Sequence, residues 1–141
     1  AASDSSWNIQ YNNLMDGLSL GVGQGENGTT QDLSTIYAKY TMGSLSVGYQ
    51  ISEVDNTGST ADEESTHIGA SLAVNENLSV SAGRFEVDMG AGKVDEESTG
   101  FSASYVMGST TIGFVANSTE NVAGTSGSDD SYREIAVSFA F

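Results

Sequence analysis

The sequence has no cysteine and no proline, and basic residues are scarce. The absence of cysteine excludes a disulfide framework, thiol catalysis and a zinc site built on cysteines. The absence of proline suits long strands, because proline cannot donate a ladder hydrogen bond. The 4 basic and 19 acidic residues leave a net charge of −15, which argues against nucleic acid as a partner. No run approaches the roughly 20 apolar residues of a membrane helix.

What the chain does have is alternation of apolar and polar residues, with no helical period anywhere. Hydrophobic residues make up 38%, so we do not expect a large dry core. Turn-rich polar stretches separate the alternating runs. We predict nine strands, at residues 7–11, 18–23, 36–42, 45–52, 68–74, 78–83, 100–107, 111–116 and 132–141.

The last strand places Ile135, Val137, Phe139 and Phe141 on one face, and the chain stops on that aromatic residue. In a soluble domain such a strand exposes apolar side chains and unpaired backbone. A closed barrel in lipid solves both problems. The polar faces of the strands carry small residues, mainly Ser, Gly and Thr, whereas a soluble barrel fills its centre with bulky ones. The pattern therefore favours apolar side chains in lipid around a water-filled lumen.

The connections between the predicted strands alternate in length, which is typical of outer-membrane barrels. Short turns are expected at 12–16, 42–44, 75–77 and 107–109, and longer loops at 25–31, 54–65, 88–98 and 117–131. Nearly all acidic residues fall on the long-loop side. We therefore expect an acidic mouth that concentrates cations at low salt.

Aromatic residues gather at the short-turn ends, which predicts one girdle at a membrane interface. Its members are Tyr11, Tyr40, Tyr105, Phe139 and Phe141. Candidates for the opposite girdle are Trp7, Tyr132 and Phe85.

One strand breaks the pattern after Ala82, where continued alternation puts Arg84 and Glu86 on the apolar face and Phe85 on the polar face. Two interpretations stay open. Either the strand bulges and resets its register, or Arg84 has reached the level of the lipid headgroups.

The chain resembles the C-terminal half of the Gram-negative general porins, especially those of alphaproteobacteria. The resemblance rests on the turns Met42-Gly43-Ser44 and Met107-Gly108-Ser109, the acidic Gly-rich loops and the terminal Phe139-Ala140-Phe141. It implies an all-β, transmembrane antiparallel β-barrel of 16 strands, assembled as a homotrimer in the outer membrane. It also implies passive diffusion of small hydrophilic solutes and ions, with the final Phe belonging to the barrel-assembly signal.

Strand parity predicts that residues 1–141 form the C-terminal portion of one barrel domain and begin in a surface loop. A complete bacterial barrel has an even number of strands, and nine is odd. The missing N-terminal half is then a partner, together with the lipid bilayer and lipopolysaccharide. Alternatively, Ser5–Tyr11 is not a transmembrane strand, and eight strands form a small complete barrel with a structural or adhesive role and no open pore.

Five polar residues are candidate pore-lining groups, with Lys39 favoured: Gln10, Lys39, Gln50, His67 and Glu134. Two acidic triplets recur 33 residues apart and are candidate calcium ligands, although a solvated acidic rim is the simpler interpretation: Asp62, Glu63, Glu64 and Asp95, Glu96, Glu97. No cofactor is required. An enzyme at the rim around His67 is the third class, with little support, because the chain has one His and no Cys.

Overall fold

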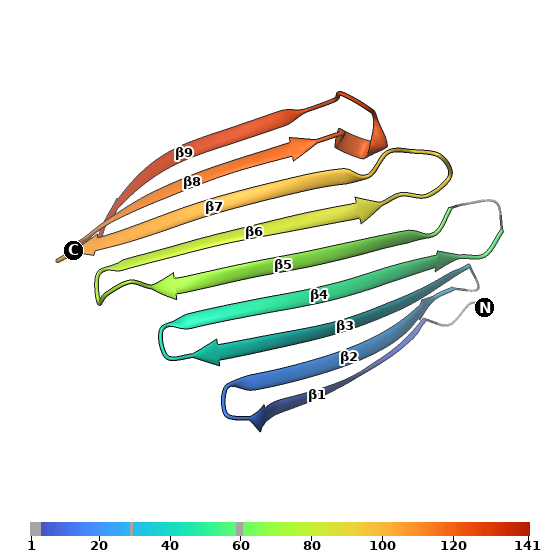
Figure 1. The fold of residues 1–141 in the computed structure, drawn as a ribbon, viewed down its shortest axis with the longest axis horizontal. Coiled ribbons are helices and arrows are strands. Elements are labelled where there is room, and N and C mark those ends of the chain that lie inside the picture. Colours follow the sequence, from blue (N-terminus) through green and yellow to red (C-terminus); the bar gives the residue numbers. More distant parts are fainter. Residues whose placement is uncertain (1–3, 29, 59–60) are drawn as a thin grey trace.

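The computed structural model describes residues 4–28, 30–58 and 61–141. Within these residues the chain forms nine antiparallel strands in one sheet, whose spatial order is the order in the sequence (Figure 1). The strands are β1 Ser5–Met15, β2 Leu18–Asn27, β3 Gln31–Met42, β4 Leu45–Asn56, β5 Glu63–Ala73, β6 Leu78–Asp88, β7 Glu96–Met107, β8 Thr110–Glu120 and β9 Asp130–Phe139. The predicted all-β fold and the nine strands are confirmed.

The strands alternate between short turns at one end of the sheet and longer loops at the other (Figure 1). The N-terminal end of the described chain lies at the long-loop end, and the C-terminus lies at the short-turn end. A single 3₁₀ turn, η1 (Val122–Gly124), interrupts the last long loop. Residues 29 and 59–60, which belong to the predicted long loops, lie outside the described residues. No helix in the described part of the chain is long and apolar enough to cross a membrane.

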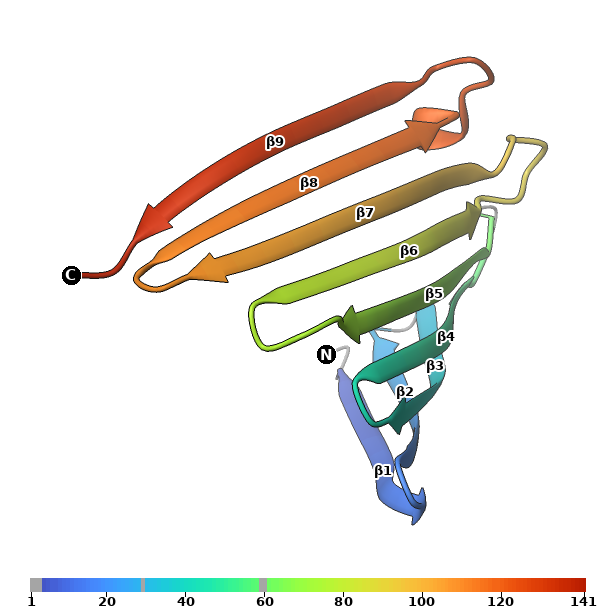
Figure 2. The ribbon, with the colours of Figure 1, turned by 60° about the vertical axis from the view of Figure 1, so that its left-hand side comes forward.

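The sheet is open and curved, and its two edges do not meet in the described residues. β1 pairs only with β2, and β9 pairs only with β8. Figure 2 shows that the sheet curls, so that β1 to β4 turn away from the plane of β5 to β9. No apolar side chain of the described residues is buried, and Ile9 and Phe139 are 64% and 66% exposed. The described sheet therefore has no hydrophobic core of its own, and its apolar side chains are left exposed.

Residues 5–11 of the eight-stranded alternative form part of strand β1, which belongs to the sheet. It extends from Ser5 to Met15 and pairs with β2 in regular register from Ser5 to Asn12. The turn predicted at 12–16 is wrong by several residues. The strand passes through an irregularity between Asn12 and Met15, where Asn13 has a φ of 60°, and it turns only after Met15. Asn tolerates this left-handed conformation better than most residues.

The other short turns follow the prediction closely. Gly43 and Gly108 each open a two-residue turn with a positive φ of 59° and 61°. Gly at the first loop position is the usual solution for a tight hairpin. In the turn after β5, the Asn75 side chain accepts hydrogen bonds from the backbone N–H groups of Asn77 and Leu78, both at 2.9 Å. Local side-chain chemistry thus defines the short-turn end.

Candidate functional site

Register sorts every strand residue onto one of two faces. On β9 the apolar face carries Ile135, Val137 and Phe139, and the polar face carries Ala136 and Ser138 between them. On β5, for example, Ile68 and Leu72 lie on the apolar face, while His67 and Ser71 lie on the polar face. This arrangement follows from the period of two in a strand.

Three consecutive rows of residues cross the middle of the polar face from β3 to β8. The first row carries side chains of mixed size: Tyr37, Gln50, His67, Phe85, Ser98 and Thr119. The second row begins at Lys39, ends at Asn117, and contains what we call the glycine row: Gly48, Gly69, Gly83 and Gly100. The third row is almost all hydroxyls: Thr41, Ser46, Ser71, Ser81 and Ser102, followed by Val115.

Two depressions lie along these rows. One has a volume of about 640 Å³ and reaches from Tyr37 on β3 to Thr119 on β8. The other, of about 490 Å³, reaches from Lys39 to Asn117. Because one depression spans six neighbouring strands, the polar face is the concave face of the curled sheet. Between Lys39 and Asn117 the glycine row leaves bare backbone as its floor.

Hydroxyl groups on this concave face pair across strands. Thr41 Oγ1 lies 3.0 Å from Ser46 Oγ, and Ser81 Oγ lies 2.7 Å from Ser102 Oγ. Each such pair still offers hydrogen-bonding capacity to water, because a hydroxyl has one donor and two acceptor sites. The wall is therefore wettable throughout the third row.

All five predicted pore-lining residues lie on the polar face. Gln10 pairs with Gly21 across β1 and β2, Gln50 lies directly opposite His67, and Glu134 pairs with Val115. Lys39 and His67 both line the larger depression. Their shared face agrees with the prediction, but their role in lining a pore is still a prediction.

Sequence reasoning missed Tyr37 and misplaced two aromatic residues. Phe85 and Tyr132 were expected in a girdle, but both lie on the polar face. The Phe85 ring stacks against His67, with ring centroids 4.2 Å apart and an interplanar angle of 32°. The unbroken alternation of β6 is the signal that places Phe85 correctly.

The register of β6 also decides between the two interpretations of Arg84. No bulge occurs, since pairing with β5 runs without a shift from Ser79 to Asp88. Arg84 consequently lies on the apolar face, where its Nη2 donates to Glu86 Oε2 at 2.6 Å and to Glu97 Oε2 at 2.7 Å.

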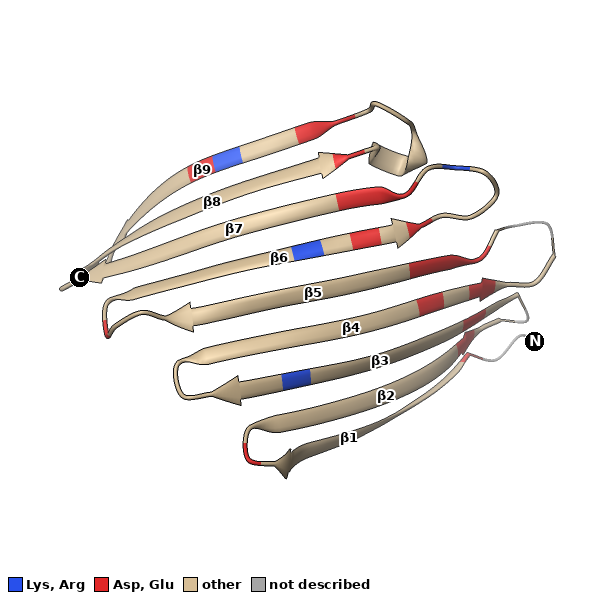
Figure 3. Ribbon diagram, viewed as in Figure 1, with Lys and Arg blue, Asp and Glu red and all other residues tan. Residues whose placement is uncertain are grey.

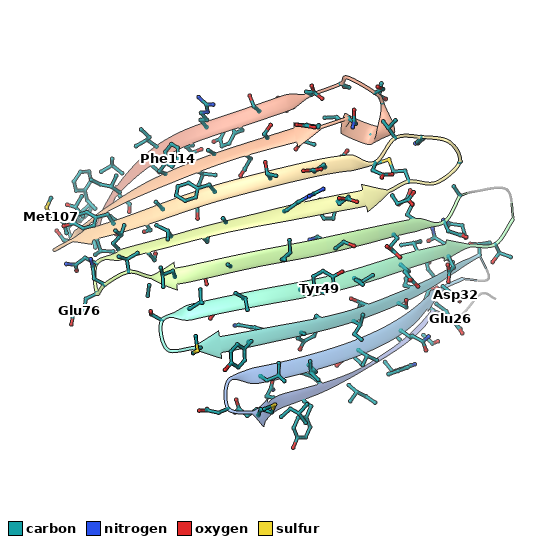
Figure 4. All side chains as sticks on the ribbon, in the orientation of Figure 1. Glu26, Asp32, Tyr49, Glu76, Met107 and Phe114 are labelled. Atoms are coloured by element: carbon teal, nitrogen blue, oxygen red, sulfur yellow. The ribbon has the colours of Figure 1, made fainter. Side chains whose placement is uncertain are left out.

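Acidic residues on the apolar face crowd its long-loop end (Figure 3). They form three rows of three directly opposed carboxylates, which we call the acidic belt: Glu26–Asp32–Asp55, Glu53–Glu64–Asp88 and Glu86–Glu97–Glu120. Figure 4 shows Glu26 and Asp32 near one another at this end and Met107 at the opposite end. These nine carboxylates lie on the face away from the concave wall, and the acidic mouth is still a prediction.

The offset between the rows of the acidic belt is related to the tilt of the strands. Each row crosses two strand spacings, and the next row begins two residues lower on the shared strand, as from Asp55 to Glu53. The belt thus falls by one residue per strand on average. With a rise of about 3.3 Å per residue and about 4.8 Å between strands, a strand tilt of roughly 35° would bring the three rows to the same mean height. Transmembrane barrels have strand tilts of about 35–45°.

The two acidic triplets do not gather around one point. Glu64 and Glu97 lie in the belt, whereas Glu63 and Glu96 begin their strands on the opposite, polar face. Asp62 instead accepts a hydrogen bond from the Asn56 backbone N–H at 2.8 Å, and Glu96 accepts one from Ala123 N–H at 2.7 Å. Asp95 precedes β7 in the loop. Among the described residues no group of three His, Asp or Glu could hold a metal ion.

Around His67 the described residues offer no catalytic pair. The His67 ring stacks on Phe85. A nucleophile and its base need to lie within hydrogen-bond reach of each other. The geometry thus gives the rim-enzyme hypothesis no support.

Comparison with known proteins agrees with this architecture. A solved structure described as a porin superposes with a TM-score of 0.78 at 18% sequence identity, covering 94% of this chain and 50% of that one. The chain therefore spans about half the length of that porin. No curated protein matches the sequence. A family model of Gram-negative porins matches residues 2–124. With most of its length matched in sequence and its fold shared with a porin, the chain belongs to the Gram-negative porin family.

Proposed function

We propose that this chain forms the C-terminal portion of one outer-membrane barrel domain, which acts as a water-filled channel for passive diffusion of small hydrophilic solutes and ions. The observation that supports this most directly is the segregation of the two faces. Hydroxyls, amides and bare glycine backbone line the concave side, and exposed aliphatic and aromatic side chains cover the convex side. Family and fold indicate a channel rather than an enzyme.

The partners of this proposal follow from the two open edges and the convex face. The free edges of β1 and β9 carry unpaired backbone groups, which strands from the remaining half of a porin would satisfy. A 16-stranded ring assembled as a homotrimer is the expected form. The exposed apolar side chains would contact the lipid bilayer, with the acidic belt at the level of the lipopolysaccharide headgroups. Calcium at the surface loops stays a prediction that the geometry does not favour.

The experiment is a conductance measurement on the purified full-length protein, folded in detergent and added to planar lipid bilayers. We expect stepwise, long-lived increases in ion conductance at low applied voltage, and swelling of proteoliposomes in small sugars. A matched control is the same protein denatured before addition, which should give no steps. Folded protein that inserts without conducting would contradict the proposal and favour a barrel with a closed interior.

A further inference from the structure

The charges of the strands are divided unevenly between the two faces. The apolar face holds the nine carboxylates of the acidic belt together with Arg84 and Arg133. The polar face holds only four carboxylates among the described strands. These are Glu63, Glu96, Asp130 and Glu134. The strongly acidic composition therefore does not describe the concave wall.

Three of these four carboxylates lie at the rim and not in the middle of the wall. Glu63, Glu96 and Asp130 are the first residues of β5, β7 and β9, at the long-loop end. Glu134 lies deeper, but on β9, the edge strand, six strands away from β3. Between β2 and β8, Lys39 is the one Lys, Arg, Asp or Glu side chain in the middle of the described wall.

Lys39 is also free to act on a solute. No described carboxylate lies within 4.0 Å of it, since both ion pairs of the described residues belong to Arg84. It lines both large depressions, and the neighbouring Gly48 and Gly69 add no side chain between the ammonium group and the open space. Gln50, His67 and Asn117 add neutral polar groups around the larger depression.

We propose that Lys39 is the specificity-determining residue of this wall and draws small anions, such as carboxylates and phosphate, along the concave face. This inference rests on the proposed channel function and names the solute class that the wall favours. The carboxylates of the acidic belt lie on the other face of the sheet and do not line this wall.

The test measures reversal potentials of the full-length protein in planar bilayers under a tenfold KCl gradient, repeated with potassium acetate. Lys39→Glu and Lys39→Gln are compared with Lys39→Arg, which keeps the charge. Glu134→Gln is the second polar-face variant. Glu64→Gln is the matched control, because it removes a charge at the acidic belt without touching the concave face.

We expect Lys39→Gln to raise the permeability of potassium relative to the anion by up to about fivefold, which is the effect of one charge at contact distance in water. Lys39→Glu should raise it further, Lys39→Arg should preserve it, and Glu134→Gln should shift it the opposite way. Glu64→Gln should leave it unchanged.

Conducting channels whose selectivity ignores Lys39, or responds equally to Glu64→Gln, would overturn this inference while leaving the channel function intact. Folded wild-type protein without any conductance would remove the channel function and this inference together. Heat-modifiable gel mobility verifies that each variant is folded before it is measured.

Discussion

Arg84 forms ion pairs with two carboxylates of the acidic belt. Glu86 and Glu97 lie directly opposite each other on β6 and β7, and Glu97 faces Glu120 on β8. Like charges in such positions repel and destabilise a sheet. Arg84 bonds to two of the three, at 2.6 and 2.7 Å, and so offsets their repulsion where the apolar surface ends.

We therefore predict that Arg84→Gln lowers the free energy of unfolding by about 0.2–1 kcal/mol at low ionic strength. The side chains are partly exposed, at 50% for Arg84 and 35% for Glu97, which limits the effect. The measurement is urea unfolding of the folded full-length protein in detergent, followed by Trp fluorescence. Molar salt should shrink the loss, because it screens the carboxylates.

Arg133→Gln is the control for this prediction. Arg133 also lies on the apolar face, opposite Ala116, and takes part in neither ion pair of the described residues. Its substitution should change stability less. Equal losses for the two variants, or a loss at Arg84 that is insensitive to salt, would mean that the repulsion within the belt is not what Arg84 relieves.

The strands as elements were largely predictable, because alternation specifies both a strand and its faces. The nine strands and the common face of Gln10, Lys39 and Gln50 follow from that period, and the two glycine turns follow from the turn-forming residues between the runs. What the pattern missed was the length of the strands at the long-loop end. There β4 continues to Asn56 and β5 begins at Glu63, because backbone pairing persists where apolar residues have stopped.

The predictions were wrong at positions where the side-chain type does not match the face on which the residue lies. An aromatic residue on a polar face, such as Phe85 or Tyr132, was assigned to a girdle because its chemistry was weighted above its register. The stack of Phe85 on His67 depends on two strands meeting, and no local pattern reports it. The acidic belt depends on register across seven strands, from β2 to β8, so it also lay beyond the sequence.

Neighbouring positions on β5 test the assignment of the two faces. Leu72 lies on the apolar face and is 37% exposed, and Ser71 precedes it on the polar face. We expect Leu72→Lys to cost up to about 1 kcal/mol of folding free energy in bilayers, because Leu72 lies near the short-turn end of β5, where a lipid-facing lysine is close to the membrane interface. Ser71→Lys should cost much less, because its ammonium group reaches water.

The readout is the urea midpoint of folding into lipid vesicles for the two variants side by side. A larger penalty for Ser71→Lys than for Leu72→Lys would reverse the faces, and the proposed lumen would then be the dry side. Similar penalties would also contradict the assignment, because only one of the two positions should contact hydrocarbon.

For the whole molecule, the open sheet is the decisive feature. The outer edges of β1 and β9 are unpaired in the described residues, and the convex surface is apolar and exposed. The solved porin that superposes on this chain is about twice as long. We predict that the undigested polypeptide from its native membrane has a mass near twice the 14.6 kDa of this chain or somewhat more.

Intact-mass spectrometry of the extracted, denatured protein is the measurement, with cross-linking before denaturation to count the subunits. A polypeptide of 14.6 kDa would contradict completion by the same chain. Several copies would then have to close the ring, and cross-linking would show them as a fixed multiple.

In the proposed orientation, the acidic belt affects how the protein is positioned in the membrane. With strands tilted by roughly 35°, the three rows of carboxylates have the same mean height around the wall. Moving the protein deeper into the membrane would bring several of these carboxylates into hydrocarbon at once. Tilting it would bring those on one side into hydrocarbon. In this orientation the acidic belt would restrict the depth and the tilt of the protein in the membrane without any contact to a partner.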